Sequence, residues 1–301
     1  MPLPNFIIVG SAKCGTTSLY NYLKQHPQVF MPLLKEPGFF TGAWPHLVNS
    51  EKEYRELFDG AQGKIAIGEA SPMYIEDQSV PQKMIDFLGP DTRIIIILRN
   101  PIDRAFSLWG HLHYHSMVEP LSFEDALSVE RERSESEELK NQDIYYPGIF
   151  MYYRGGLYTE KVRRFLDTFG EKNVYVIIFE EFMQDLRNSI KDLYKFLGVD
   201  TSFEPILEQH NIANVPRLKQ LQKQLSNPPK IIRVIYSISP RFIKTLIYSV
   251  GKTIYWTNQK KRTKDNLDPK IQACLSNKFR NDVVDLEHLL HRELRTYWDI
   301  Y

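Results

Sequence analysis

A chain of 301 residues, with 43% hydrophobic and 25% charged residues, is long enough for one large globular domain with a substantial core. Its net charge of +1 argues against nucleic-acid binding as the main function, and its two cysteines do not suggest a disulfide framework. No apolar run reaches the ~20 residues of a membrane span and no signal peptide precedes the first predicted strand, so we expect a cytoplasmic protein.

Short apolar runs alternate with helical patterns through the first two-thirds of the chain. Strands are predicted at 6–9, 65–68, 94–98 and 174–179, and helices at 18–25, 82–87, 102–114, 157–169 and 189–196. This alternation favours an α/β fold in which a central parallel sheet carries helices on both faces. We expect residues 1–301 to form a single domain.

The first predicted strand runs into the loop Gly10-Ser-Ala-Lys-Cys-Gly-Thr-Thr-Ser18. Gly10 and Gly15 remove side chains where the backbone must bend and approach a ligand, and the free N–H groups that open the next helix suit an anion. A Walker A motif would have lysine at Thr16, whereas the cation here is Lys13. The loop therefore predicts phosphate binding without ATP or GTP hydrolysis. A plain strand-to-helix turn is the alternative.

The segment Leu34-Lys-Glu-Pro-Gly-Phe-Phe40 follows the first predicted helix. Its Lys35–Glu36 pair stands in an aromatic loop that contains a proline. This apolar setting favours Glu36 as a general base, because a carboxylate in such surroundings can be tuned for proton transfer. A surface ion pair is the alternative interpretation.

The predicted strand 94–98 is a continuous apolar run, which is typical of a strand buried on both faces. Arg99 follows at its carboxyl end, where open α/β sheets bind their ligands. Ser107 lies two turns along the next predicted helix. The two side chains could hold one phosphate from two sides. Alternatively, Arg99 caps a loop and Ser107 faces solvent.

Three histidines, His111, His113 and His115, alternate near the end of that helix. A spacing of two does not place side chains on one helical face, so we expect no metal site. His111 is a candidate acceptor ligand or auxiliary base. Ordinary helix-end histidines are the alternative.

Two further segments lie towards the C-terminus. Residues 227–259 combine prolines with apolar residues at near-helical spacing and interspersed Lys and Arg. We expect a helical insertion that packs on the core, closes over the acceptor site as a lid, or lies on a membrane surface. Lys260, Lys261 and Arg262 begin a basic run that could close over a polyanionic ligand, with a solvated loop as the alternative.

Taken together, these segments resemble the PAPS-dependent sulfotransferases, in particular heparan sulfate sulfotransferase domains and their bacterial relatives. Residues 11–19 resemble the family's 5′-phosphosulfate loop and 99–107 its 3′-phosphate motif. Residues 35–40 are similar to the segment with its catalytic glutamate, and 68–74 to a substrate-side stretch. The resemblance implies the P-loop-containing sulfotransferase fold. It also implies metal-free transfer of a sulfuryl group from PAPS to an acceptor hydroxyl or amine, with PAP as the product.

The resemblance further implies roles for individual residues. The expected catalytic residues are Lys13, Lys35 and Glu36, with Glu36 as the base. Cofactor contacts are expected from Ser11, Lys13, Cys14, Gly15, Thr16, Thr17, Ser18, Arg99, Ser107, Lys260, Lys261 and Arg262. Acceptor contacts are expected from Phe40, Glu69, Tyr74 and His111.

The chain also departs from this family's pattern. Gly38 stands where relatives often carry histidine, and Ala70 where heparan-type enzymes often carry lysine. We therefore expect a small-molecule or natural-product acceptor, with a glycan or a lipid as the alternative. Two other hypotheses remain. One is a degenerate P-loop kinase or NTPase with Glu69 as its Mg²⁺ ligand, and the other is a non-catalytic nucleotide-binding module.

Overall fold

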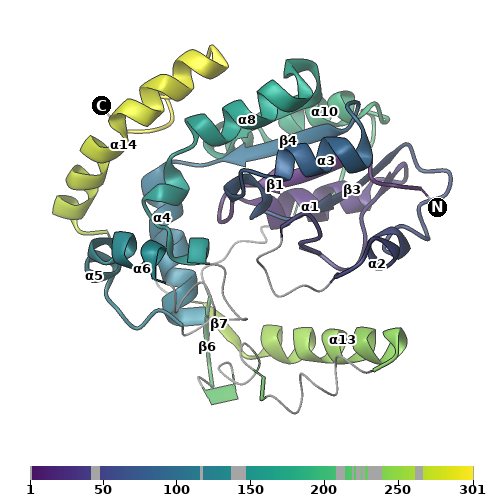
Figure 1. Ribbon diagram of the computed structural model, residues 1–301, viewed down its shortest axis with the longest axis horizontal. Coiled ribbons are helices and arrows are strands. Elements are labelled where there is room, and N and C mark those ends of the chain that lie inside the picture. The colour runs from purple at the N-terminus through teal and green to yellow at the C-terminus, as the bar shows by residue number, and fades with distance from the viewer. Residues whose placement is uncertain are drawn as a thin grey trace.

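The computed structural model describes residues 2–41, 48–115, 118–136, 147–207, 214–218, 220–221, 225, 228–229, 239–261 and 267–300. Its centre is a five-stranded parallel sheet in the order β2-β3-β1-β4-β5 (Figure 1). The strands are β1 (Phe6–Gly10), β2 (Val29–Phe30), β3 (Ala66–Ala70), β4 (Arg93–Leu98) and β5 (Val174–Ile178). The predicted α/β fold is therefore confirmed.

Helices cover both faces of this sheet (Figure 1). The α-helices of the described residues, not all of which lie on the sheet, are α1 (Thr16–Gln25), α2 (Glu51–Glu56), α3 (Val80–Leu88), α4 (Pro101–Gly110), α5 (Phe123–Ser128), α6 (Glu130–Glu135), α8 (Thr159–Phe169), α9 (Phe179–Gln184), α10 (Leu186–Leu197), α13 (Arg241–Thr257) and α14 (Pro269–Leu290). Successive strand residues point to opposite faces. Ile94 and Ile96 thus join the core with α3, α8 and α14, whereas Ile95 and Ile97 join the core with α1 and α10.

The order of the strands reverses at β1, which pairs with β3 on one side and with β4 on the other. Such a switch point leaves a crevice at the carboxyl ends of the strands, where ligands of open α/β sheets bind. The loop after β1 and Arg99 after β4 both open onto this edge. The fold therefore gathers segments that are far apart in the sequence.

Two predicted elements end earlier than expected. The helix predicted at 102–114 stops at Gly110, and His111–His115 form a single π-helical turn. The strand predicted at 174–179 stops at Ile178, because Phe179 already begins α9. Apolar spacing did not reveal either change, since apolar residues continue on both sides of each boundary, with Leu112 after Trp109 and Phe179 after Ile178.

A small antiparallel pair lies beyond α4. It consists of β6 (Asn214–Pro216) and β7 (Gln259–Lys261), and β6 contacts the π-helical turn. Figure 1 shows α13, which leads into β7, set apart from the sheet beyond the far end of α4. Positions 260 and 261, predicted in a basic loop, are strand residues instead, because their backbone pairs with β6. Within the described parts of the chain, no helix is long and apolar enough to cross a membrane.

Candidate active site

The loop after β1 is shaped around its glycines. Its first amide, the Ser11 N–H, donates to the Ile97 carbonyl of β4 at 2.8 Å, which ties the loop to the neighbouring strand. Gly15 has φ 100° and immediately precedes α1, whose N-terminus has no side-chain cap. An uncapped helix N-terminus, with the positive end of the helix dipole, is suited to bind an anion. The Ser11 hydroxyl oxygen is buried and has no hydrogen-bond partner among the described residues.

Replacing Gly15 by a residue with a side chain is expected to destabilise the folded protein. A Cβ at this position would lie 3.0 Å from the Phe179 ring, and the positive φ disfavours any L side chain. We expect Gly15→Ala to lower the free energy of unfolding by more than the ~1–2 kcal/mol of backbone strain alone. Gly63→Ala is the matched control, because Gly63 has φ +76° with nothing within 4 Å of its Cβ. Urea unfolding measures both variants, and equal losses would contradict the proposed contact with Phe179.

Lys13 stands at the centre of the loop with a φ of 70°. Burial lowers the pKa of its ammonium from 10.5 to about 8, while the nearby Glu36 carboxylate acts in the opposite direction. Arg99 and Lys35 contribute further to the lower pKa of Lys13. The loops after β1, β2 and β4 therefore bring these four charged side chains within electrostatic reach of one another. A bound anion would stabilise the three cations together.

The pKa of Lys13 predicts how PAP binding depends on pH. Lys13 loses its charge as the pH rises through about 8 in the free protein, and a bound phosphate would raise this pKa. We expect the Kd for PAP to increase about tenfold between pH 8 and pH 9.5. Phosphate groups themselves, with a second pKa near 6, do not titrate in this range. Calorimetry on wild type and Lys13→Ala checks this, because the variant should show a nearly flat profile; a flat wild-type profile would contradict the assignment.

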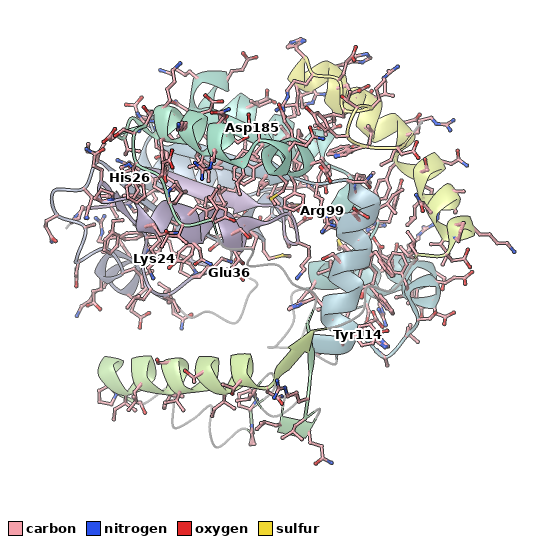
Figure 2. All side chains as sticks on the ribbon, turned by 180° about the vertical axis from the view of Figure 1, so that it is seen from behind. Lys24, His26, Glu36, Arg99, Tyr114 and Asp185 are labelled. Atoms are coloured by element: carbon pink, nitrogen blue, oxygen red, sulfur yellow. The ribbon has the colours of Figure 1, made fainter. Side chains whose placement is uncertain are left out.

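Glu36 lies in the loop after β2, beside the end of β3. Its N–H donates to the Ala70 carbonyl at 3.0 Å, and its backbone has φ 63°. The carboxylate pairs with the Lys35 ammonium and keeps 38% of its side-chain surface exposed. Figure 2 shows Glu36 and Arg99 on different loops near the sheet. A hollow beside Glu36 is lined by Gly38, Thr41, Ser71, Pro72, Met73 and Tyr74. An exposed carboxylate next to a hollow is suited to receive a proton from a small acceptor.

Glu69 supports the loop that carries Glu36. Its carboxylate is fully buried and accepts hydrogen bonds from the Ser71 hydroxyl at 2.8 Å and the Tyr54 hydroxyl at 3.4 Å. Ser71 in turn accepts from the Gly38 N–H at 3.4 Å. Burial raises the pKa of Glu69 to about 7. Glu69 is therefore placed to orient the Glu36 loop through Ser71.

The other residues predicted to contact the acceptor are mostly buried. Phe40 is 4% exposed and packs against the rings of Tyr54 and Tyr74. Tyr74 is fully buried, although it lines the hollow beside Glu36. His111 begins the π-helical turn that contacts β6. Acceptor contact by Phe40, Glu69, Tyr74 and His111 stays a prediction.

Arg99 leaves the end of β4 with part of its guanidinium unsatisfied. Its Nε is buried without a hydrogen-bond partner among the described residues, and its Nη2 lies 3.3 Å from the Asp103 carboxylate. The guanidinium also stacks over the Phe179 ring, with its carbon 5.3 Å from the ring centroid. Asn100 caps α4, the helix that carries the partly exposed Ser107. An arginine fixed in this way has a donor left for a phosphate.

Tyr158 joins the two candidate phosphate segments. Its hydroxyl donates to the Arg99 carbonyl at 2.8 Å and lies 3.9 Å from the sulfur of the buried Cys14. The Tyr158 N–H donates to the Asp282 carboxylate of α14 at 2.7 Å. Sequence reasoning found neither this bridge nor the Phe179 ring beneath Gly15 and Arg99. These contacts join residues far apart in the chain, so no local pattern could reveal them.

The basic run that begins at Lys260 is described by the structure only in part. Lys260 and Lys261 belong to β7, and Arg262 lies outside the described residues. Their contact with a cofactor stays a prediction. In the part of the chain that the structure describes, no group of three or more His, Cys, Asp or Glu side chains could hold a metal ion.

Comparison with known proteins identifies the family. Residues 3–246 match the model of the "Sulfotransferase domain". The chain belongs to the sulfotransferase family. A crystal structure of a sulfotransferase from Alicyclobacillus acidocaldarius is 32% identical, with a TM-score of 0.72, and the match covers 98% of this chain and 99% of that one. The predicted family and its P-loop-containing fold are therefore confirmed.

Curated sulfotransferases share parts of their length with this chain. The bifunctional heparan sulfate N-deacetylase/N-sulfotransferase 4 of Mus musculus is 25% identical over 299 residues, which cover 96% of this chain and 30% of that protein. The membrane-associated sulfotransferase kil1 of Dictyostelium discoideum is 31% identical over 117 residues, which cover 39% of this chain and 24% of that protein. The matched regions thus represent about a quarter to a third of each of these relatives.

Proposed function

We propose that this sulfotransferase transfers the sulfuryl group of PAPS to the hydroxyl or amine of a small-molecule or natural-product acceptor. One observation carries the proposal. Lys13, Glu36 and Arg99 come from three separate loops to one edge of the sheet, where they interact electrostatically. The buried Ser11 hydroxyl and Arg99 Nε have no partner among the described residues. This set offers fixed cations and donors for a bis-phosphorylated nucleotide and one carboxylate for an acceptor proton.

The proposed roles follow from this placement. The N–H groups that open α1, with the hydroxyls of Thr16 and Thr17, would hold the 5′-phosphate. Arg99 and Ser107 would hold the 3′-phosphate, which distinguishes PAPS from ADP-like nucleotides. Lys13 would neutralise the negative charge that grows on the leaving oxygen, and Lys35 would steady the sulfuryl oxygens.

Glu36 would take the proton of the acceptor as the new S–O or S–N bond forms. Its loop geometry is fixed by the Ala70 and Ser71 contacts, so the base is held in place before the acceptor binds. Positioning and charge stabilisation supply most of the rate enhancement in such transfers, by analogy with phosphoryl transfer. No residue needs to form a covalent intermediate.

The kinase alternative is less well supported by the geometry. It requires Glu69 as an Mg²⁺ ligand, but this carboxylate is fully buried, bonded to Ser71 and Tyr54, and has a pKa raised to about 7. A partly protonated, saturated carboxylate is a poor ligand for a hard cation. The non-catalytic alternative predicts nucleotide binding without transfer. A glycan or lipid acceptor and a cytoplasmic location also stay predictions.

A radiochemical assay tests the proposal. The protein is incubated with ³⁵S-labelled PAPS and separate panels of phenols, aliphatic alcohols, amines, polysaccharides and lipid dispersions, and label in each acceptor is counted. We expect incorporation in at least one panel with wild type and at least 10²-fold less with Glu36→Gln. Equal incorporation by both proteins would contradict the role of Glu36. PAP binding without incorporation in any panel would favour the non-catalytic module.

A further inference from the structure

Positive charge is concentrated in one segment of the chain. Residues 209–264 contain 12 Lys and Arg and no Asp or Glu. The rest of the chain has 26 Lys and Arg against 37 Asp and Glu, a net charge of −11. The near-neutral net charge of the whole chain is therefore the sum of a strongly basic segment, 209–264, and an acidic remainder. Such a separation of charge creates a local field that attracts an anionic surface.

The helix inside this segment presents an apolar face to solvent. Leu246, Ile247, Val250 and Ile254 of α13, the α13 apolar face, are 62%, 37%, 49% and 37% exposed. At 100° per residue these four positions fall within about 100° of the helix circumference, so they form one stripe. The hydroxyls of Thr253 and Thr257 bond back to helix carbonyls at 3.0 Å, which reduces the polarity of the same side.

This helix is fixed at one end and lies on the side of the molecule away from α8 and α14. Asn258, at the end of α13, accepts the Leu218 N–H at 2.9 Å through its side-chain oxygen and donates to the Leu218 carbonyl at 3.1 Å. Leu218 itself is 62% exposed and follows β6. Figure 1 shows α13 projecting beside β6 and β7, on the side of the molecule away from α8 and α14. Its apolar face is therefore held on a projecting element.

We propose that α13 docks in the plane of an anionic phospholipid surface. The α13 apolar face would enter the headgroup region, and the net positive charge of residues 209–264 would attract the anionic lipids. Exposed apolar side chains alone would be compatible with many binding partners. Because they lie in a basic segment that contains no Asp or Glu, an anionic partner is favoured. The length of α13, 17 residues, and its three basic residues are typical of a helix that lies on a membrane.

Vesicle sedimentation tests this proposal without any nucleotide or acceptor, so it is independent of the proposed sulfuryl transfer. Wild type is mixed with vesicles of phosphatidylglycerol and phosphatidylcholine, or of phosphatidylcholine alone. We expect sedimentation only with the anionic vesicles and a loss of binding in 0.5 M NaCl, since the Debye length falls from about 8 Å to a few Å.

Uncharged variants separate the apolar face from charge, because they leave the net charge of the segment unchanged. Val250→Ser/Ile254→Ser should weaken vesicle binding by at least about tenfold. Ile206→Ser is the control, because Ile206 is 71% exposed outside the basic segment, and it should bind as wild type does. Thermal unfolding of all three proteins verifies folding.

Two kinds of outcome would overturn the proposal. The first is an absence of sedimentation with anionic vesicles, or unchanged binding by the double variant. The second is a dimer, in the absence of vesicles, that the double variant abolishes, because this would assign the α13 apolar face to a second copy of the chain. Loss of transfer activity in the double variant, together with no vesicle binding by wild type, would assign α13 to an acceptor lid.

Discussion

Replacing Glu36 by glutamine is expected to lower the rate of sulfuryl transfer about 10²- to 10⁴-fold, the usual contribution of a general base. Glutamine keeps the size and hydrogen-bonding reach of the side chain but cannot accept the acceptor proton. Glu36 sits among Lys13, Lys35 and Arg99, so removing its negative charge should leave PAP affinity unchanged or slightly higher. Initial rates with saturating PAPS and calorimetry with PAP measure the two effects separately.

The matched control for this variant is Glu171→Gln, since Glu171 is an exposed carboxylate outside the site. It should retain wild-type rates. A large loss of PAP affinity in Glu36→Gln would contradict the base assignment, because it would show that Glu36 supports the nucleotide rather than the acceptor. A normal rate in Glu36→Gln would also contradict it.

Lys13→Ala is expected to lower kcat/KM about 10²- to 10³-fold, comparable with the loss of one donor to a developing negative charge. The ammonium is the cation of the loop between β1 and α1, and burial has already lowered its pKa to about 8. Below that pH Lys13 is charged in the free protein, and this buried charge lowers the free energy of unfolding relative to an exposed lysine. Removing it should leave the melting temperature without ligand unchanged or higher.

The same variant should lose most of the stabilisation that PAP gives, which a structural role for Lys13 would not predict. Lys172→Ala is the matched control, because Lys172 is exposed outside the site. Scanning calorimetry with and without PAP measures both effects. A lower melting temperature in Lys13→Ala without ligand, combined with an unchanged response to PAP, would contradict the proposed role.

The sequence predicted the central strands well because their apolar runs are unambiguous. Ile94–Leu98 has no polar residue, and all five side chains are buried. The two-residue strand β2 escaped notice because Val29–Phe30 is too short to show a period. The π-helical turn also escaped notice, since hydrophobic spacing does not distinguish it from the end of an α-helix.

Local patterns in the sequence indicated candidate site residues, whereas their burial and their contacts with distant segments could not be predicted from it. The loop from Gly10 to Ser18 displays its glycines and its lysine in consecutive positions. The burial of Glu69 and the bridge of Tyr158 between Cys14 and Arg99 depend instead on packing between distant segments. Acceptor contact by Glu69, which the family resemblance implies, stays a prediction, and the hydrogen bonds through Ser71 show in addition that Glu69 supports the Glu36 loop.

Nucleotide-dependent thermal stability tests the central claim most directly, with PAP, ADP and ATP–Mg²⁺ compared on wild type and Arg99→Ala. A ligand at about 100 times its Kd adds roughly 2.7 kcal/mol to the free energy of unfolding. The proposed 3′-phosphate site predicts a much larger shift with PAP than with ADP in wild type, and nearly equal shifts in Arg99→Ala. A shift with ATP–Mg²⁺ alone would contradict the account and favour a kinase or NTPase.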